Sequence, residues 1–244
     1  MASLFLGEFL GTLVLVLLGD GVVANVVLNK TKGQNSGWIV ITTGWCFAVL
    51  VGVFVAQATG SPGAHINPAV TVAQSYIGNL PWNQVPTYWA AQFLGAFVGA
   101  VLVWLQYLPH WSVTEDKGLK LAVFCTGPAI RSFGANLVSE IIGTIVLVFG
   151  IFAIFSKGFM GTGLANGYGP YLVALLVWGI GLSLGGSTGY AINPARDLGP
   201  RIAHAILPIP GKGGSDWGYA AIPVVGPAIG AVIATLMVKM IGGF

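Results

Sequence analysis

The chain has 244 residues, of which 55% are hydrophobic and only 7% are charged, and its mean hydropathy is +0.84. Soluble domains carry roughly 25% charged residues, so the composition excludes a soluble globular protein and indicates an integral membrane protein. The formal net charge of +3 is spread along the chain without a basic cluster, which argues against a nucleic-acid partner.

Six long apolar segments are candidates for crossing a lipid bilayer, which takes about 20 residues in a helix. In chain order they are residues 4–28, 38–59, 86–108, 135–155, 170–184 and 219–241. Two shorter apolar stretches, residues 68–76 and 194–205, can enter a membrane only part of the way. A polar loop at residues 109–133 joins the third long segment to the fourth. These segments leave no room for a soluble domain, so we expect one membrane domain over residues 1–244.

The two halves of the chain repeat each other. Residues 8–16 read Glu-Phe-Leu-Gly-Thr-Leu-Val-Leu-Val, and residues 140–148 read Glu-Ile-Ile-Gly-Thr-Ile-Val-Leu-Val. The repeat halves cover about residues 4–108 and 134–241, each with three long segments and one short one. Because three spans per half is an odd number, the halves must lie in opposite orientations in the membrane. The predicted fold is therefore an all-α membrane protein with six transmembrane helices and two re-entrant half-helices in an inverted repeat.

Each short segment begins at an Asn-Pro-Ala triplet. The triplets are Asn67-Pro68-Ala69, within Ser-Pro-Gly-Ala-His-Ile-Asn-Pro-Ala-Val-Thr, and Asn193-Pro194-Ala195, within Ser-Thr-Gly-Tyr-Ala-Ile-Asn-Pro-Ala-Arg-Asp. Asn is a preferred N-cap and Pro is favoured at the first helical position, so each triplet predicts a helix start. Two helix dipoles and two free amide NH2 donors would then meet at one point. Such a break at membrane depth is tolerated only inside protein or along a water-filled cavity.

Arg196 lies three residues after Asn193 and so shares its helix face. A charge at membrane depth usually lines a water-filled path, where an arginine repels cations and protons. The first repeat has Val70 at the matching position, which makes the predicted pore asymmetric. The sequence contains no phosphate-binding loop, no His/Cys ligand cluster and no nucleophile–base pair. We therefore expect no enzyme activity, no metal and no cofactor.

These motifs resemble the major intrinsic protein family, the aquaporins and glycerol facilitators, over nearly the whole chain. Asp197, directly after Arg196, resembles the glycerol-facilitator or aquaglyceroporin branch. The resemblance implies a passive channel for glycerol, water and other small neutral solutes that excludes ions and protons. Urea, dihydroxyacetone and undissociated small acids are further candidate solutes. The alternatives are a water-selective aquaporin, a proton-coupled small-solute transporter and a closed scaffold protein.

The resemblance also implies roles for individual residues. The selectivity filter combines Arg196 and Tyr190 with Gly181 and an aromatic residue, Trp45 or alternatively Phe47. Gly181 stands where water-selective relatives usually have His, so it is expected to widen the opening. Tyr190 replaces the Phe that is more usual in glycerol facilitators, and its hydroxyl is expected either to narrow the opening or to add a hydrogen bond. The residues just before each triplet, called the lead-ins here, are expected to have an extended backbone that points carbonyl oxygens into the pore. These carbonyls belong to Gly63, Ala64, His65, Ile66, Gly189 and Ala191.

The remaining expectations concern acidic residues inside the helices, the oligomeric state and the orientation in the membrane. By resemblance, Glu8 and Glu140 brace the re-entrant loops, and four subunits with separate pores form a homotetramer. The family places both termini in the cytoplasm. The compactness of the chain suggests the plasma membrane of a bacterium. The lysines in the loops favour the reverse orientation by the positive-inside rule. From the residues alone, Asp20 is expected at the membrane interface. Asp197 and Arg201, four residues apart, are expected to pair.

Overall fold

The computed structural model describes residues 2–160 and 167–243; residues 1, 161–166 and 244 of the predicted domain lie outside the described residues. Within the described ranges the regular structure is helical. The long helices are α1 (Leu4–Val27), α2 (Trp38–Ala58), α4 (Val85–Gln106), α7 (Phe133–Ile154), α9 (Gly169–Leu184) and α11 (Ile222–Met240). The two short helices that begin at the triplets are α3 (Pro68–Ile77) and α10 (Pro194–Ile206). All eight agree with the predicted segments to within three residues at each end.

By length and composition, five of the described helices can cross a membrane: α1, α2, α4 with the 3-10 turn before it (Trp82–Gln84), α7 and α11. Helix α9 is apolar but has only 16 residues. A further short helix, α8 (Lys157–Met160), follows α7.

The connection at residues 109–133 is not the open polar loop that the sequence suggested. It contains α5 (Leu108–Val113) and α6 (Lys117–Phe124). Helix α6 is capped by Asp116, whose side chain accepts the backbone N–H groups of Gly118 and Leu119. Trp111 and Phe124 are fully buried and stack with their ring centroids 5.6 Å apart. Buried aromatic packing and a helix cap therefore order this segment despite its charge.

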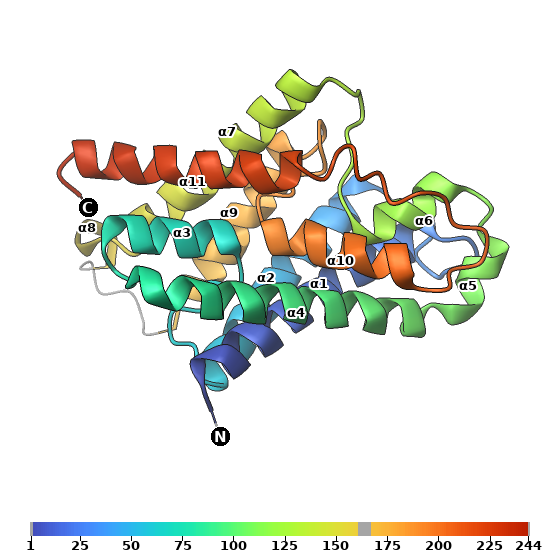
Figure 1. Ribbon diagram of the computed structural model, residues 1–244, viewed down its shortest axis with the longest axis horizontal. Helices are drawn as coiled ribbons and strands as arrows, with labels where there is room; N and C mark the ends of the chain where they lie inside the picture. The colour runs from blue at the N-terminus through green and yellow to red at the C-terminus, as the bar shows by residue number, and fades with distance from the viewer. Residues whose placement is uncertain (1, 161–166, 244) are drawn as a thin grey trace.

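The two halves interleave. Helix α1 packs against α2 and α4, and its counterpart α7 packs against α9 and α11. The short helices cross between the halves, because α3 packs against α11 and α10 packs against α4. In Figure 1, α3 and α10 lie end to end in the middle of the molecule, with the starts of both helices toward the centre. This arrangement places the two triplets at one point in the interior.

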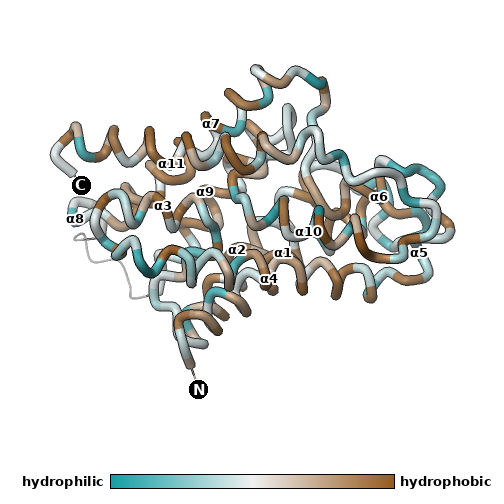
Figure 2. Tube along the Cα trace, viewed as in Figure 1, coloured by the Kyte–Doolittle hydropathy of each residue, from teal (hydrophilic) through white to brown (hydrophobic). Residues whose placement is uncertain are grey.

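Glycines allow the matching helix pairs to come close. A Cβ built on Gly99 of α4 would lie 2.6 Å from the carbonyl oxygen of Leu13 in α1, and one on Gly230 of α11 would lie 2.6 Å from that of Ile141 in α7. Small residues at such crossings are typical of membrane helices, which gain their association from close backbone packing. Hydrophobic residues dominate the long helices, whereas hydrophilic residues gather in the loops around α5 and α6 (Figure 2).

Candidate functional site

The two triplets start their helices as predicted. The side-chain oxygen of Asn67 accepts the backbone N–H of Ala69 at 2.9 Å, and that of Asn193 accepts the N–H groups of Ala195 and Arg196 at 3.1 and 3.3 Å. Each cap satisfies donors that the first helical turn leaves unpaired.

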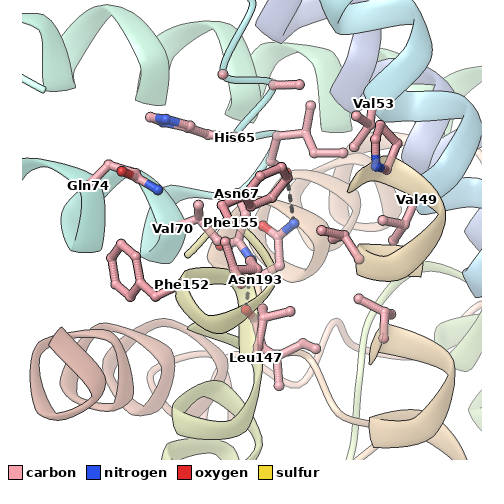
Figure 3. Close-up of a pocket in the computed structure, with 18 of the residues that line it drawn as sticks. Val49, Val53, His65, Asn67, Val70, Gln74, Leu147, Phe152, Phe155 and Asn193 are labelled. Atoms are coloured by element: carbon pink, nitrogen blue, oxygen red, sulfur yellow. Dashed lines mark hydrogen bonds between the residues drawn. The ribbon is translucent and has the colours of Figure 1, made fainter. Parts of the chain in front are cut away.

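The prediction that both amide NH2 groups are free is wrong for one hydrogen of each. Asn67 Nδ2 donates to the carbonyl of Ile192, and Asn193 Nδ2 donates to the carbonyl of Ile66, both at 2.9 Å. These crossed hydrogen bonds tie the two halves together where the short helices meet (Figure 3). Because an amide nitrogen carries two hydrogens, each Asn keeps one N–H for the cavity that both residues line.

The lead-in to each triplet has an unusual backbone that the expectation of an extended chain did not include. Ala64 and Ile66 in the first half, and Tyr190 and Ile192 in the second, have positive φ angles of 41°, 43°, 39° and 42°. A non-glycine residue in this left-handed region costs about 1–3 kcal/mol. The same pair of strained positions recurs three residues and one residue before each Asn, so the strain belongs to the repeated architecture.

Glu8 holds the first strained lead-in. Its carboxylate is fully buried and accepts hydrogen bonds from Ser61 Oγ, from the backbone N–H groups of His65 and Ile66, and from Gln92 Nε2, at 2.6 to 2.8 Å. Sequence reasoning missed Gln92, although a glutamine inside an apolar helix was a signal for it. A buried carboxylate with four donors fixes the loop in a conformation that it would not otherwise keep.

Glu140 does the same for the second lead-in. It accepts from Thr188 Oγ1 at 2.7 Å and from the backbone N–H groups of Ala191 and Ile192 at 3.0 and 2.8 Å. Only 1% of Glu140 is exposed. The hydroxyl and two successive backbone donors match those of the first half, and the backbone hydrogen bonds expected from the resemblance are present on both sides.

The guanidinium of Arg196 lies over the ring of Trp45, with its carbon 4.0 Å from the ring centroid. Trp45 lines the cavity and is 4% exposed, whereas Phe47 is 56% exposed and is not among the described residues that line it. Of the two aromatic candidates, Trp45 therefore faces Arg196. Gly19 of α1 makes this possible, since any Cβ there would collide with the indole ring.

The expectation that Asp20 sits at the membrane interface is wrong. Asp20 is fully buried in α1, and its Oδ1 lies 3.4 Å from Nη1 of Arg196. The helix continues for seven residues beyond it to Val27, so Asp20 is not at the helix end, and its burial and its contact with Arg196 place it in the interior of the bundle. A carboxylate between two glycines in an apolar span was the signal for an internal ion pair.

Gly181 does not itself border the opening. The ring of Tyr190 fills the notch that Gly181 and Gly185 leave on α9, because a Cβ on Gly181 would lie 2.7 Å from Cζ of Tyr190 and one on Gly185 would lie 2.5 Å from its Cδ1. Trp38 packs edge-on against the same ring at 5.9 Å and donates from Nε1 to the carbonyl of Gly181 at 3.0 Å. Tyr190 lines the cavity, and Gly181 lies behind it outside the described lining.

These groups border one elongated cavity of about 740 Å³. It runs from Arg196, Trp45 and Tyr190, past Asn67 and Asn193, to Gln74 and Phe155 beyond the triplets. Figure 3 shows side chains from α2, α3 and α7 converging on this space, among them Val49, Val70, Gln74 and Leu147. The walls are mainly apolar, with polar groups at separated points along the path.

The predicted carbonyl positions divide between this cavity and its surroundings. Gly63, Ala64, His65, Ile66 and Ala191 line it, whereas Gly189 is not among the described lining residues. His65 stacks on Tyr88 at 4.5 Å, and its Nδ1 lies 3.2 Å from Thr71 Oγ1, so its ring is fixed on the wall.

Asp197 and Arg201 form the expected pair, and both are fully buried. Arg201 Nε donates to Asp197 Oδ1 at 2.8 Å, while Asp197 Oδ2 accepts from the backbone N–H and hydroxyl of Thr126 at 2.8 and 2.6 Å. The pair therefore anchors α10 to the connection between the halves and does not itself face the cavity. No group of three His, Cys, Asp or Glu among the described residues could hold a metal ion.

The chain is similar to known membrane proteins over nearly its whole length. A sequence model of the family "Major intrinsic protein" matches residues 2–238. The chain is 62% identical to a probable glycerol uptake facilitator protein of Thermotoga maritima, over 95% of this chain and 96% of that protein. It is 58% identical to a glycerol uptake facilitator protein of Streptococcus pneumoniae, over 98% of this chain and 99% of that one. The X-ray structure of the aquaglyceroporin from Plasmodium falciparum has a TM-score of 0.85 and 32% identity, covering 96% of this chain and 94% of that chain.

Proposed function

The chain belongs to the major intrinsic protein family, and on that premise we propose that it is a passive membrane channel for glycerol, other small uncharged solutes and water. The aquaporin-like fold agrees with the predicted six-helix inverted repeat with two half-helices. The relatives are named as uptake facilitators, and the protein is a channel rather than an enzyme.

One observation carries this proposal: a single cavity runs from Arg196 on the face of Trp45 to the paired Asn67 and Asn193. A polyol has carbon–hydrogen edges and hydroxyl groups on different sides. The indole face and the valine and leucine walls suit the carbon edges, whereas Arg196, the free amide N–H of each Asn and the lead-in carbonyls suit the hydroxyls. An amphipathic neutral solute therefore keeps hydrogen bonds along the path.

Exclusion of ions follows from the same arrangement. A small ion must give up its hydration shell in an apolar-walled passage, and the few dipoles of the wall do not replace that shell. The starts of α3 and α10 direct two positive dipole ends at the middle of the cavity, and Arg196 adds a cationic group to its wall. Both oppose a proton or a metal cation.

We further propose that the whole chain is one channel domain, in which Glu8 and Glu140 act as braces and Asp197 fixes α10. We assign a homotetramer in a bacterial plasma membrane by resemblance to the family. On helix α7, Val138, Ile142 and Val146 recur every four residues and are exposed, so they form an apolar stripe suited to lipid or to a neighbouring subunit. Both termini are assigned to the cytoplasm by resemblance.

The test is stopped-flow light scattering on proteoliposomes, first with sucrose and then with glycerol or urea as the osmolyte. Re-swelling in glycerol that is much faster than in protein-free vesicles, and that stays linear with concentration, supports the channel. Fast water flow without glycerol entry would favour the water-selective alternative. A saturable flux that accumulates glycerol under an imposed proton gradient would identify a coupled transporter instead. Absence of both fluxes would leave the closed scaffold.

A further inference from the structure

Asp20 is a buried acid with no role in the solute path of the proposed channel. It lies in the interior of α1, is fully buried and is not among the described residues that line the cavity. Its Oδ1 faces Nη1 of Arg196 at 3.4 Å, and its Oδ2 has no hydrogen-bond partner among the described residues. An ionisable side chain is costly at this depth and is normally retained for a purpose.

Arg196 depends on few partners. Among the described residues, Asp20 accepts the one hydrogen bond that its guanidinium makes, and Trp45 supplies the aromatic face beneath it. The neighbouring acid, Asp197, is committed elsewhere, since its oxygens accept from Arg201 and Thr126. Asp20 is therefore the acid that directly faces the cation of the proposed selectivity filter, the part of the cavity bordered by Arg196, Trp45 and Tyr190 and called the constriction below.

Adjacent residues of α1 serve the same group. Gly19 leaves the space that the ring of Trp45 occupies, and Asp20 reaches the guanidinium that lies on that ring. One turn of α1 thus sets both the position and the surroundings of the filter arginine from behind, without entering the path of the solute.

We propose that Asp20 is the counter-ion of Arg196: it holds the guanidinium on Trp45 and offsets its charge, so that the constriction rejects anions as well as cations. This inference rests on the proposed channel function. An unpaired guanidinium in a narrow, apolar-walled passage concentrates anions, by roughly tenfold or more for clefts of one charge sign. With Asp20 one layer behind, the same donors remain available to hydroxyl groups while the net charge at the constriction falls to zero.

The experiment compares Asp20→Asn, Arg196→Gln and the double variant with the unsubstituted protein. The full chain is reconstituted in planar bilayers under a potassium chloride gradient, and glycerol permeability is measured in vesicles from the same preparation. Thr12→Val is the matched control, because Thr12 is a fully buried polar residue of α1 whose hydroxyl has no partner among the described residues. It removes a polar atom from the same helix without touching Arg196.

The charges predict opposite signs. Asp20→Asn should give a chloride-selective conductance at least about tenfold above that of the unsubstituted protein, with slower glycerol flux because the guanidinium loses its orientation. Arg196→Gln should instead favour potassium, and the double variant should favour neither ion. Thr12→Val should behave as the unsubstituted protein does.

Folded Asp20→Asn protein with no ion conductance and unchanged glycerol flux would overturn the inference. If Asp20→Asn alone cannot be purified in folded form, adding Arg196→Gln should restore folding, since no unpaired buried charge then remains. A double variant that stays unfolded would overturn it as well. Failure of the unsubstituted protein to pass glycerol would refute the proposed function. The opposite ion selectivities of Asp20→Asn and Arg196→Gln would still test whether the two side chains offset each other's charge.

Discussion

Replacing Gly181 by Ala is the sharpest perturbation of the constriction that the structure offers. The new Cβ would lie 2.7 Å from Cζ of Tyr190, 2.8 Å from its hydroxyl oxygen and 3.1 Å from Cγ2 of Thr42. Ordinary van der Waals contact begins near 3.4 Å, so the ring must move by roughly 0.7 Å. Helix α9 lies behind the ring, and Tyr190 already lines the cavity. The ring therefore moves away from α9 and into the passage.

The two consequences have different sizes. Overpacking costs about 1–3 kcal/mol, and the gain of Ala over Gly in a helix returns about 0.5–1 kcal/mol, so the loss of stability stays small. A solute that must push the ring back meets the strain at the moment of passage. If that strain amounts to about 1.4 kcal/mol, glycerol entry slows about tenfold. Water is narrower and slows far less, so the ratio of glycerol to water permeability should fall.

The assay is stopped-flow light scattering with glycerol and with sucrose, and Gly179→Ala is the matched control. Gly179 lies on the same helix, and a Cβ there would meet nothing within 4 Å, so the control has the same helix preference without the collision. Equal glycerol-to-water ratios in the two variants would refute the idea that the notch on α9 sets the width of the constriction through Tyr190.

Two further variants test the buried acids that hold α10 and the second lead-in in place. Asp197→Asn breaks an ion pair whose partners are both fully buried and should cost about 3–5 kcal/mol of folding free energy. Arg131→Gln removes a solvent-exposed guanidinium from its pair with Asp216 and should leave the stability nearly unchanged. Thermal unfolding in detergent measures both variants, and equal losses would contradict the anchoring role of Asp197. Glu140→Gln replaces one of the two acceptor oxygens with an NH2 donor, which must then face a hydroxyl or backbone N–H donor. The variant should lose about 1–3 kcal/mol of folding free energy and pass glycerol more slowly. An unchanged melting temperature together with full flux would show that the strained backbone does not depend on Glu140.

The repeated features were predictable because the chain contains two copies of each. Glu8 and Glu140 precede the same Gly-Thr pair, and Asn67 and Asn193 begin the same triplet, so each copy supports the reading of the other. Helix bounds followed from apolar length, and the N-caps followed from the chemistry of Asn and Pro. The crossed hydrogen bonds between each Asn and the opposite Ile carbonyl were not predictable, because spacing along the chain does not tell which backbone atoms of the other half lie within reach.

Two of the features that the sequence did not predict, the surroundings of Asp20 and of Gly181, lie where the two halves differ. Asp20, Arg196 and Tyr190 have no counterpart of the same kind in the other repeat, so no second copy was available to show their surroundings. Asp20 was expected at the membrane interface because its depth in α1 depends on how far the helix continues past it. The contact of Gly181 with Tyr190 was not predictable, because the ring that occupies the notch comes from a loop that is not adjacent in sequence. The symmetric contacts hold the two lead-ins and the two triplets in place in both halves. The asymmetric contacts lie around Arg196 and Tyr190: Asp20 and Trp45 from the first half contact Arg196 of the second half, and Tyr190 contacts Gly181 within the second half. If selectivity among solutes is set there, both halves contribute to it, and substitutions at these asymmetric contacts should change selectivity more than substitutions at the symmetric ones.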